Sequence, residues 1–221
     1  MLMTRTSVRE RRHREDAPRA EQKQLTRQAL LDAALRLLEG HSFDSLSLRE
    51  VTREVGIVPT AFYRHFESME ELGLVLVDES FRTMRRMIRA AREGALPQAK
   101  LIRRSVETFV HYVQAHRAYF RFILRERFGG VASIRGAIRN EIRLFVSELA
   151  TDLARFPDGD RWSTDDLRMV AGLLVNVSVA ATEQILELSP RDPEGEAEVM
   201  RTTEKQMRYV VLAAPHWRSQ R

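Results

Sequence analysis

Apolar residues recur at helical spacing along almost the whole chain, and this pattern constrains the fold more than any other feature. Leu30, Ala33, Ala34, Leu37 and Leu38 follow the order i, i+3, i+4, i+7, i+8, which places them on one face of a helix. No alternating run of β-branched residues reaches the length of a strand. Only ten glycines and seven prolines interrupt 221 residues, so helix breakers are scarce. The sequence predicts an all-α protein.

Local start and stop signals mark two short helices near residue 50. Ser47 and Glu50 have the spacing of a capping box, in which each side chain satisfies a backbone amide of the other residue. Gly56 is expected to end the helix that Ser47 begins. Pro59 then stands at the first position of a second short helix, expected over 59–65, where its missing N–H costs nothing.

The sequence predicts longer helices in the rest of the chain, so that about nine helices are expected in total. Further capping boxes begin at Ser68 and Ser163, and prolines and glycines mark the breaks between helices. Beyond the two short helices, helical patterns are expected at about 69–92, 98–114, 117–127, 132–156, 164–188 and 194–213.

Two short helices joined by a tight turn form a helix-turn-helix over 47–66. In this motif the first helix braces the second, whose exposed side chains enter the major groove of DNA. Phe62 is expected to face the core. Thr60 and Ala61 are small enough to meet a thymine methyl, and Arg64 can pair with guanine or with a phosphate. The alternative is a packed helix with a solvated arginine.

Other polar residues near the motif suit the DNA backbone. Tyr63 and His65 carry polar tips that can bond to phosphate oxygens, and Ser47 lies at a helix N-terminus, which attracts anions. The complete predicted DNA-binding set is Thr26, Arg27, Ser47, Arg49, Pro59, Thr60, Ala61, Tyr63, Arg64 and His65.

The positive charge of the chain is concentrated before the motif. Residues 1–27 hold eight Lys and Arg against four Asp and Glu, and so supply four of the five net charges. Residues 1–20 lack apolar periodicity, and we expect them to form a basic flexible arm. An anionic partner such as nucleic acid fits this arm, although a solvated tail would have the same composition.

The order Val55-Gly56, then Tyr63-Arg64-His65-Phe66, then Glu70-Glu71-Leu72 is specific when it occurs near an N-terminus. With these motifs, residues 25–79 resemble the DNA-binding domain of TetR-type regulators. The likeness is greatest to the FabR-type repressors of unsaturated fatty-acid synthesis, and it continues weakly through 124–127, 140–142 and 148–150. Met69 departs from the pattern, because many TetR-type proteins have a phosphate-binding lysine at that position.

The resemblance implies a helix-turn-helix domain over 25–84 and a helical ligand-binding and dimerisation domain over 85–221. Aromatic residues of the second domain could line a tunnel for a long-chain acyl thioester, with arginines near its head group, although they could also be ordinary core residues. The predicted ligand-binding residues are Phe109, Tyr112, Val113, Phe120, Ile123, Arg125 and Arg127. Arg117 and Arg121 belong to the same basic cluster.

A broad apolar face with small neighbours on the helix near residue 175 suggests a homodimer contact, with a monomer core as the alternative. The predicted interface residues are Val170, Leu173, Leu174, Val177, Ala181 and Val210. A symmetric dimer would present two recognition helices about 34–36 Å apart to a pseudo-palindromic site in double-stranded DNA.

The sequence gives little support for an enzyme, a metal or cofactor protein, or a membrane protein. The chain has no cysteine, His111 and His116 are not on one helical face, and no nucleophile or dinucleotide motif occurs, so we expect no enzyme, cofactor or metal site. The most apolar stretch, 169–181, is shorter than the about 20 residues that span a bilayer, so we expect a cytoplasmic protein without a membrane partner. A regulator for another hydrophobic metabolite or drug, and a helical lipid-binding protein without DNA function, remain alternatives.

Overall fold

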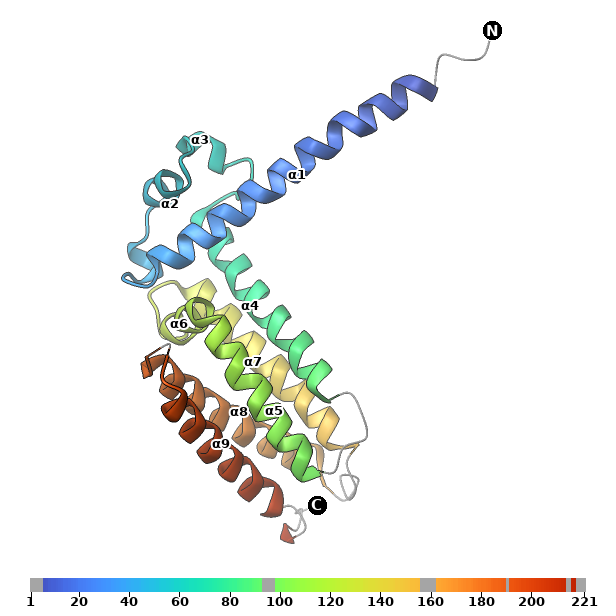
Figure 1. Ribbon diagram of the computed structural model, residues 1–221, viewed down its shortest axis with the longest axis vertical. Coiled ribbons are helices and arrows are strands. Elements are labelled where there is room, and N and C mark those ends of the chain that lie inside the picture. Colours follow the sequence, from blue (N-terminus) through green and yellow to red (C-terminus); the bar gives the residue numbers. More distant parts are fainter. Residues whose placement is uncertain (1–5, 93–97, 156–161, 190, 214–215, 218–221) are drawn as a thin grey trace. The chain divides into compact units, whose positions relative to one another are not determined.

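The structure is a computed structural model that describes residues 6–92, 98–155, 162–189, 191–213 and 216–217. It describes only the backbone of 6–19, 87, 89–92, 98–99 and 213. Over these ranges the chain forms nine α-helices, one 3-10 turn and no strand, so the predicted all-α class is confirmed (Figure 1). The elements are α1 Thr6–Leu37, η1 Phe43–Ser45, α2 Leu48–Val55, α3 Pro59–Phe62, α4 Met69–Arg92, α5 Gln98–Ala115, α6 Arg117–Glu126, α7 Ala132–Leu153, α8 Thr164–Glu187 and α9 Pro193–Ala213.

The chain divides into two compact units, one ending at Gly73 and the other beginning at Leu74, so the division falls within α4. In the first unit α1 packs on α2, and α2 on α3. Apolar side chains of these helices and of the segment that follows them form its core: Leu30, Leu31, Ala34, Val51, Phe62, Phe66 and Leu72 are almost completely buried. The core thus fixes the two short helices against the longer α1.

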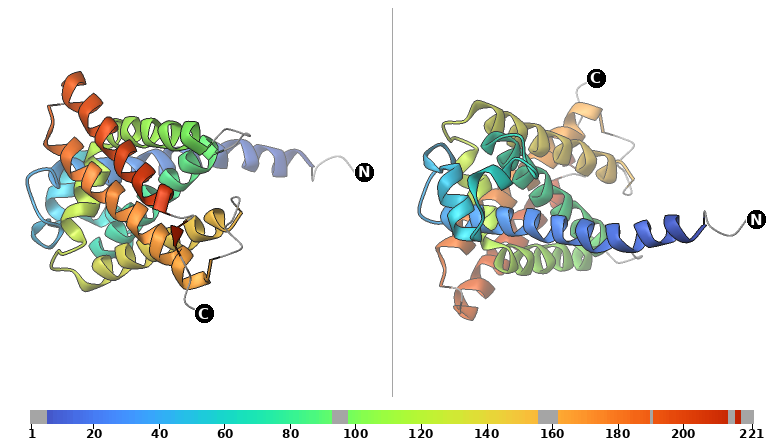
Figure 2. Two further views of the ribbon diagram at one scale, coloured as in Figure 1. Left: turned by 90° about the horizontal axis from the view of Figure 1, so that it is seen from below. Right: turned by 90° about the horizontal axis from the view of Figure 1, so that it is seen from above.

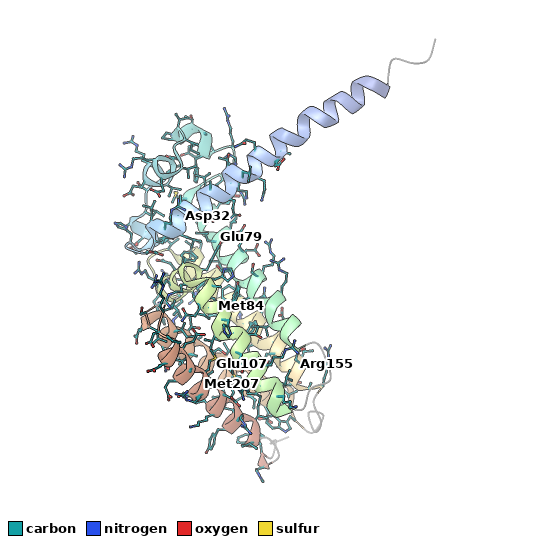
Figure 3. The ribbon with its side chains drawn as sticks, in the orientation of Figure 1. Asp32, Glu79, Met84, Glu107, Arg155 and Met207 are labelled. Carbon is teal, nitrogen blue, oxygen red and sulfur yellow. The ribbon has the colours of Figure 1, made fainter. Side chains whose placement is uncertain are left out.

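In the second unit α8 packs between α7 and α9, and α5 packs against both α8 and α9 (Figure 2). Its main core joins Val106, Phe109, Val110, Val113, Ala181, Ile185 and Val199. Met84 of α4 and Met207 of α9, both labelled in Figure 3, pack against this core while remaining partly buried. Two of the predicted ligand-binding residues of α5, Phe109 and Val113, therefore lie in the main apolar core of this unit.

Two helices have ends that differ from the sequence expectation. α1 begins at Thr6, whereas apolar periodicity indicated no helix over 1–20. Arg and Glu make up most of 9–15 and favour helix without forming an apolar stripe, so periodicity alone misses them. α3 ends at Phe62 instead of residue 65, because the amides of Arg64 and His65 bond three residues back, to Ala61 and Phe62, in the tighter pattern of a 3-10 turn.

α8 is long and apolar enough to cross a membrane, judged by length and composition alone. Several of its apolar side chains, Val170, Ala171, Leu174 and Ala181 among them, are buried within the second unit. Core helices of soluble proteins have this composition too, so one such helix is weak evidence for a membrane span.

Candidate nucleic-acid interface

A capping box begins α2 and a glycine ends it. Ser47 Oγ accepts a hydrogen bond from the amide of Glu50 at 3.3 Å, and the amide of Ser47 donates to Glu50 Oε2 at 2.9 Å, which confirms the predicted box. Gly56 ends α2 with a φ of +76°, in the left-handed region that a residue with a Cβ adopts only at a cost. These two local devices fix where α2 begins and where the chain turns towards α3.

Two phenylalanines anchor α3 from its inner side. Phe62 is 0% exposed and Phe66 is 1% exposed, and their ring centroids lie 5.5 Å apart. Tyr63 meets Phe62 edge to face at 5.7 Å, yet 62% of Tyr63 remains exposed. The apolar face of α3 is therefore buried in the core, and the remaining faces of the helix are available to another molecule.

The outer side of α3 and the two residues that follow it carry the side chains predicted to read DNA. Pro59, Thr60 and Arg64 are exposed along with Tyr63, whereas Ala61 is half-buried. Small side chains thus lie near the start of α3, and a hydrogen-bonding phenol and a guanidinium follow its last residue. This combination suits close approach to base edges together with contacts to phosphate.

Ser47 and Arg49 lie at the exposed N-terminal end of α2. The hydroxyl of Ser47 donates to Glu50 Oε2 at 2.6 Å, in addition to the amide bond described above. These hydrogen bonds lower the pKa of Glu50, so a carboxylate already lies beside this helix end. A phosphate would have to use other amides of the first turn or displace this carboxylate.

The sequence predicts that Arg27 contacts DNA, but in the structure its side chain contacts other residues of the same domain. Its Nη1 donates to the backbone oxygen of His65 at 2.5 Å, and its guanidinium carbon lies 4.2 Å from the ring centroid of Phe66. The side chain is half-buried. Its neighbour Thr26 donates to the carbonyl of Gln22 at 2.9 Å, within α1. Each of the two predicted DNA contacts on α1 therefore has a donor engaged inside the domain: the Thr26 hydroxyl and Nη1 of Arg27.

His65 is half-buried among cations. Burial lowers the pKa of its imidazole, and the charges of Lys23, Arg27 and Arg64 lower it further. Its Nδ1 is buried and has no hydrogen-bond partner among the described residues. The ring is therefore neutral at pH 7, and its predicted contact with DNA would be that of a neutral imidazole.

The aromatic residues predicted to bind a ligand gather where α5 meets α6. Tyr112 lies 5.6 Å from Phe120 and 4.3 Å from His116 between ring centroids, and Phe109 lies 6.3 Å from Phe120. Phe109, Tyr112 and Val113 are buried, whereas Phe120 and Ile123 are half-buried. The structure brings the aromatic residues together as parts of a packed core.

A polar contact at Tyr112 was not visible in the sequence. Burial raises the pKa of the Tyr112 phenol, although a hydrogen bond from Thr83 and the charge of Arg86 act in the opposite direction. Both partners lie on α4, separated from Tyr112 by a helix break. No local pattern marks such a pair, because the contact depends on how α4 and α5 pack.

The arginines predicted near a ligand head group have other surroundings. Arg125 is exposed. Arg127 Nη2 lies 3.2 Å from Glu183 Oε1, and its guanidinium covers the ring of Phe128 at 4.7 Å. Arg117 donates to the carbonyls of Ile185, Leu186 and Leu188, each at 2.8 Å. The guanidinium of Arg117 is thus engaged at the C-terminal end of α8, and a ligand contact for the basic cluster stays a prediction.

The predicted dimer residues divide between the core and the surface of the protomer. Val170, Leu174 and Ala181 are buried within their own chain, because they share the face of α8 that packs inward. Leu173 is 45% exposed, and Val177 and Val210 are half-buried. Other large apolar side chains on these helices are exposed, namely Met169, Tyr209 and Leu212.

Two glutamates on one face of α7, Glu141 and Glu148, pair with the same arginine of α4. Arg85 Nη2 lies 2.6 Å from Glu141 Oε2, and Arg85 Nε lies 3.3 Å from Glu148 Oε1. The pairing gives these carboxylates a structural role in joining α4 to α7.

Comparison with known proteins identifies families and solved structures that this chain resembles. The family model for bacterial regulatory proteins of the tetR family matches residues 30–74, and the model for the tetracyclin repressor-like C-terminal domain matches residues 97–212. A solved TetR-family transcriptional regulator from Streptomyces coelicolor is 21% identical, with a TM-score of 0.65, and the alignment covers 84% of this chain and 95% of that one.

Two further solved structures have the same fold at lower identity. A TetR-like transcriptional regulator from Rhodococcus sp. RHA1 is 17% identical, with a TM-score of 0.62, over 82% of this chain and 94% of that one. The fatty acid degradation regulator FadR from Bacillus halodurans is 13% identical, with a TM-score of 0.64, over 82% and 94%. At these identities the likeness establishes the fold alone.

TetR-family members are DNA-binding regulators and not enzymes, and they bind their operators as dimers. Because the C-terminal match alone extends over more than half of the 221 residues, and the N-terminal match includes the helix-turn-helix, this chain belongs to the TetR family of transcriptional regulators.

Proposed function

We propose that this regulator is a repressor that reads its operator with the exposed side of α3. The observation that carries the proposal is that α3 and the two residues after it have one buried side and one exposed side. Phe62 is fully buried, whereas Thr60, Tyr63 and Arg64 are exposed. An anchored helix with small and hydrogen-bonding side chains on its free side fits the major groove, with Arg64 on guanine or phosphate and Tyr63 on phosphate.

The operator is a pseudo-palindrome bound by a homodimer. Met169 and Leu173 lie four residues apart on α8 and are 42% and 45% exposed, and Tyr209 and Leu212 of α9 are 78% and 69% exposed. Only 39% of the most apolar window of α8 is buried within one protomer. A second copy of the same two helices would cover this surface and bury more apolar area.

The ligand is a long-chain acyl thioester, and the controlled genes belong to unsaturated fatty-acid synthesis. Support comes from the FabR-like motifs of the sequence and from the aromatic side chains of α5 and α6. Tyr112 would offer a neutral hydroxyl to the polar end of the ligand, with Arg86 nearby to balance negative charge. Arg125, one of the arginines first assigned to the head group, is exposed.

The basic arm adds affinity for DNA that does not depend on the base sequence of the duplex. Residues 1–20 carry six arginines against three acidic residues, a balance that suits the phosphate backbone. Deletion of 1–20 is expected to weaken binding to any duplex and to flatten its dependence on salt. An unchanged salt dependence would show that the arm does not contact phosphate.

Selection from a random pool of DNA duplexes tests the DNA-binding part of the proposal. The protein is expected to enrich a duplex with two related half-sites whose centres lie one helical turn, or a multiple of it, apart. Failure to enrich any duplex would contradict the DNA-reading role and favour a helical lipid-binding protein.

Fluorescence anisotropy on the enriched duplex then tests the ligand. Oleoyl-coenzyme A is expected to change the affinity for DNA more than palmitoyl-coenzyme A, and the FabR resemblance favours tightening by the unsaturated thioester. Free coenzyme A is the control, because it carries the head group without the acyl chain. If neither thioester changes the affinity, the acyl-thioester proposal fails, and the alternative is a regulator for another hydrophobic metabolite or drug.

A further inference from the structure

α3 is too short to hold its own orientation. It has four residues, and an isolated helix of fewer than about 12 residues is marginal in water. Of the residues that follow it, Arg64 and His65 are held by bonds to carbonyls three residues earlier, such as His65 N to Phe62 O at 2.8 Å. The orientation of its exposed side chains therefore depends on contacts with the rest of the first unit.

Arg27 supplies one of these contacts by two interactions at once. Its guanidinium donates to the carbonyl of His65 at 2.5 Å and lies 4.2 Å from the centroid of Phe66. The His65 carbonyl lies in the turn after α3, and Arg27 supplies it with a donor from α1. The planar guanidinium can stack on a ring while it donates in its plane, which an ammonium group cannot do.

The two contacts of Arg27 lie immediately after the side chains that face DNA. His65 follows Tyr63 and Arg64 directly, and Phe66 is the second anchor of α3. A shift of the His65 carbonyl would therefore move the exposed phenol and guanidinium with it. Such a shift changes how well these groups match base edges, while it leaves the number of cations near the phosphates the same.

We propose that Arg27 is a positioning residue that sets the orientation of residues 63–66 and thereby the discrimination between DNA sequences, and that it does not bind phosphate. This inference rests on the proposed DNA-reading role of α3 and is independent of the ligand. It assigns to a residue of α1 an effect on specificity that acts through the His65 carbonyl and the Phe66 ring.

The test compares Arg27→Lys and Arg27→Met with Lys23→Met, a matched control. Lys23 is exposed one turn earlier on α1, so the control removes a positive charge without breaking the contacts of Arg27. The full-length variants are measured by anisotropy on the enriched duplex and on random-sequence DNA over a range of salt concentrations. Thermal unfolding of each variant is followed by circular dichroism, and binding is measured well below the transition.

Both Arg27 variants are expected to lower the ratio of specific to random binding by about tenfold. Their salt dependence on random DNA is expected to stay that of the unaltered protein. Lys23→Met is expected to leave the specificity ratio unchanged.

Three results would overturn the proposal. If Arg27→Met flattens the salt dependence by about one unit on both duplexes and Arg27→Lys restores it, Arg27 is a phosphate contact. If both duplexes lose affinity equally and the unfolding temperature falls into the range of the measurement, Arg27 acts only on folding. If the specificity ratio is unchanged in both variants, Arg27 has no positioning role. Failure of the unaltered protein to enrich any duplex would instead contradict the proposed function itself.

Discussion

The guanidinium of Arg117 donates to the carbonyl of Ile185 at 2.8 Å, which joins the first residue of α6 to the C-terminal end of α8. The same side chain donates to two further carbonyls, those of Leu186 and Leu188. One cation thus satisfies three acceptors that α8 and the following turn cannot satisfy themselves. Burial and the charge of Arg121 lower the pKa of Arg117, but a guanidinium remains charged at any pH at which the protein folds.

Replacement of Arg117 by Met is expected to lower the free energy of unfolding by about 2–4 kcal/mol, because several partly buried carbonyls lose a charged donor. Urea unfolding monitored by circular dichroism measures the loss. Arg139→Met is the matched control, since Arg139 is exposed on α7 and a surface substitution changes stability by about 0.5 kcal/mol or less. Equal stability of the two variants would contradict the capping role.

Gly56→Ala is expected to destabilise the first unit by about 1–2 kcal/mol through its backbone alone. A Cβ at this position would meet no atom within 4 Å, so no clash contributes, but the φ of +76° is strained for alanine. Gly40→Ala provides the comparison, because its Cβ also meets open space and its φ is not positive. Thermal unfolding should separate the two variants, and a Gly56→Ala variant as stable as Gly40→Ala would contradict the left-handed turn.

The stability of the first unit is expected to fall as the pH is lowered from 7 to 5. Burial and the neighbouring cations hold the pKa of His65 in the folded protein below its usual value of 6.5, so the unfolded chain binds a proton first as the pH falls. The neutral ring therefore contributes fully to the free energy of unfolding when the pH is above the pKa of His65 in the unfolded chain. Below that pKa its contribution decreases. His65→Gln should reduce this pH dependence between pH 5 and 7. An imidazole that titrates above 6.5 in an NMR titration would contradict the assignment.

Leu173→Glu is expected to convert the dimer to monomers or to raise its dissociation constant at least about tenfold, because it places an unpaired charge in an apolar interface. Leu144→Glu on α7 is the control, since Leu144 is 53% exposed and lies outside the proposed α8–α9 surface. Analytical ultracentrifugation distinguishes the two states. A Leu173→Glu protein that remains dimeric would place the interface elsewhere.

Features that depend on neighbouring residues could be predicted from the sequence. The capping box of Ser47 and Glu50 and the left-handed Gly56 involve residues within a few positions of each other, so their spacing carries the information. The burial of Phe62 and Phe66 follows in the same way from their separation of four residues on a helical segment.

Features that depend on packing could not be predicted. Arg27 and His65 lie 38 residues apart, and Arg117 and Ile185 lie 68 apart, and each pair joins a side chain to a backbone carbonyl that any residue type would supply. The predicted dimer residues show a related limit of prediction from sequence. Periodicity marks Val170, Leu173 and Leu174 as apolar, but it cannot tell a face buried in the same chain from one left for a second copy.

The most direct test of the central claim is the affinity of the Tyr63→Phe, Arg64→Ala double variant for the enriched duplex. Both side chains are exposed, so the variant should keep the fold of the unaltered protein. If the free side of α3 reads DNA, the double variant should bind the enriched duplex about 10- to 1000-fold more weakly at the same salt concentration. An affinity equal to that of the unaltered protein would contradict the DNA-reading role of α3.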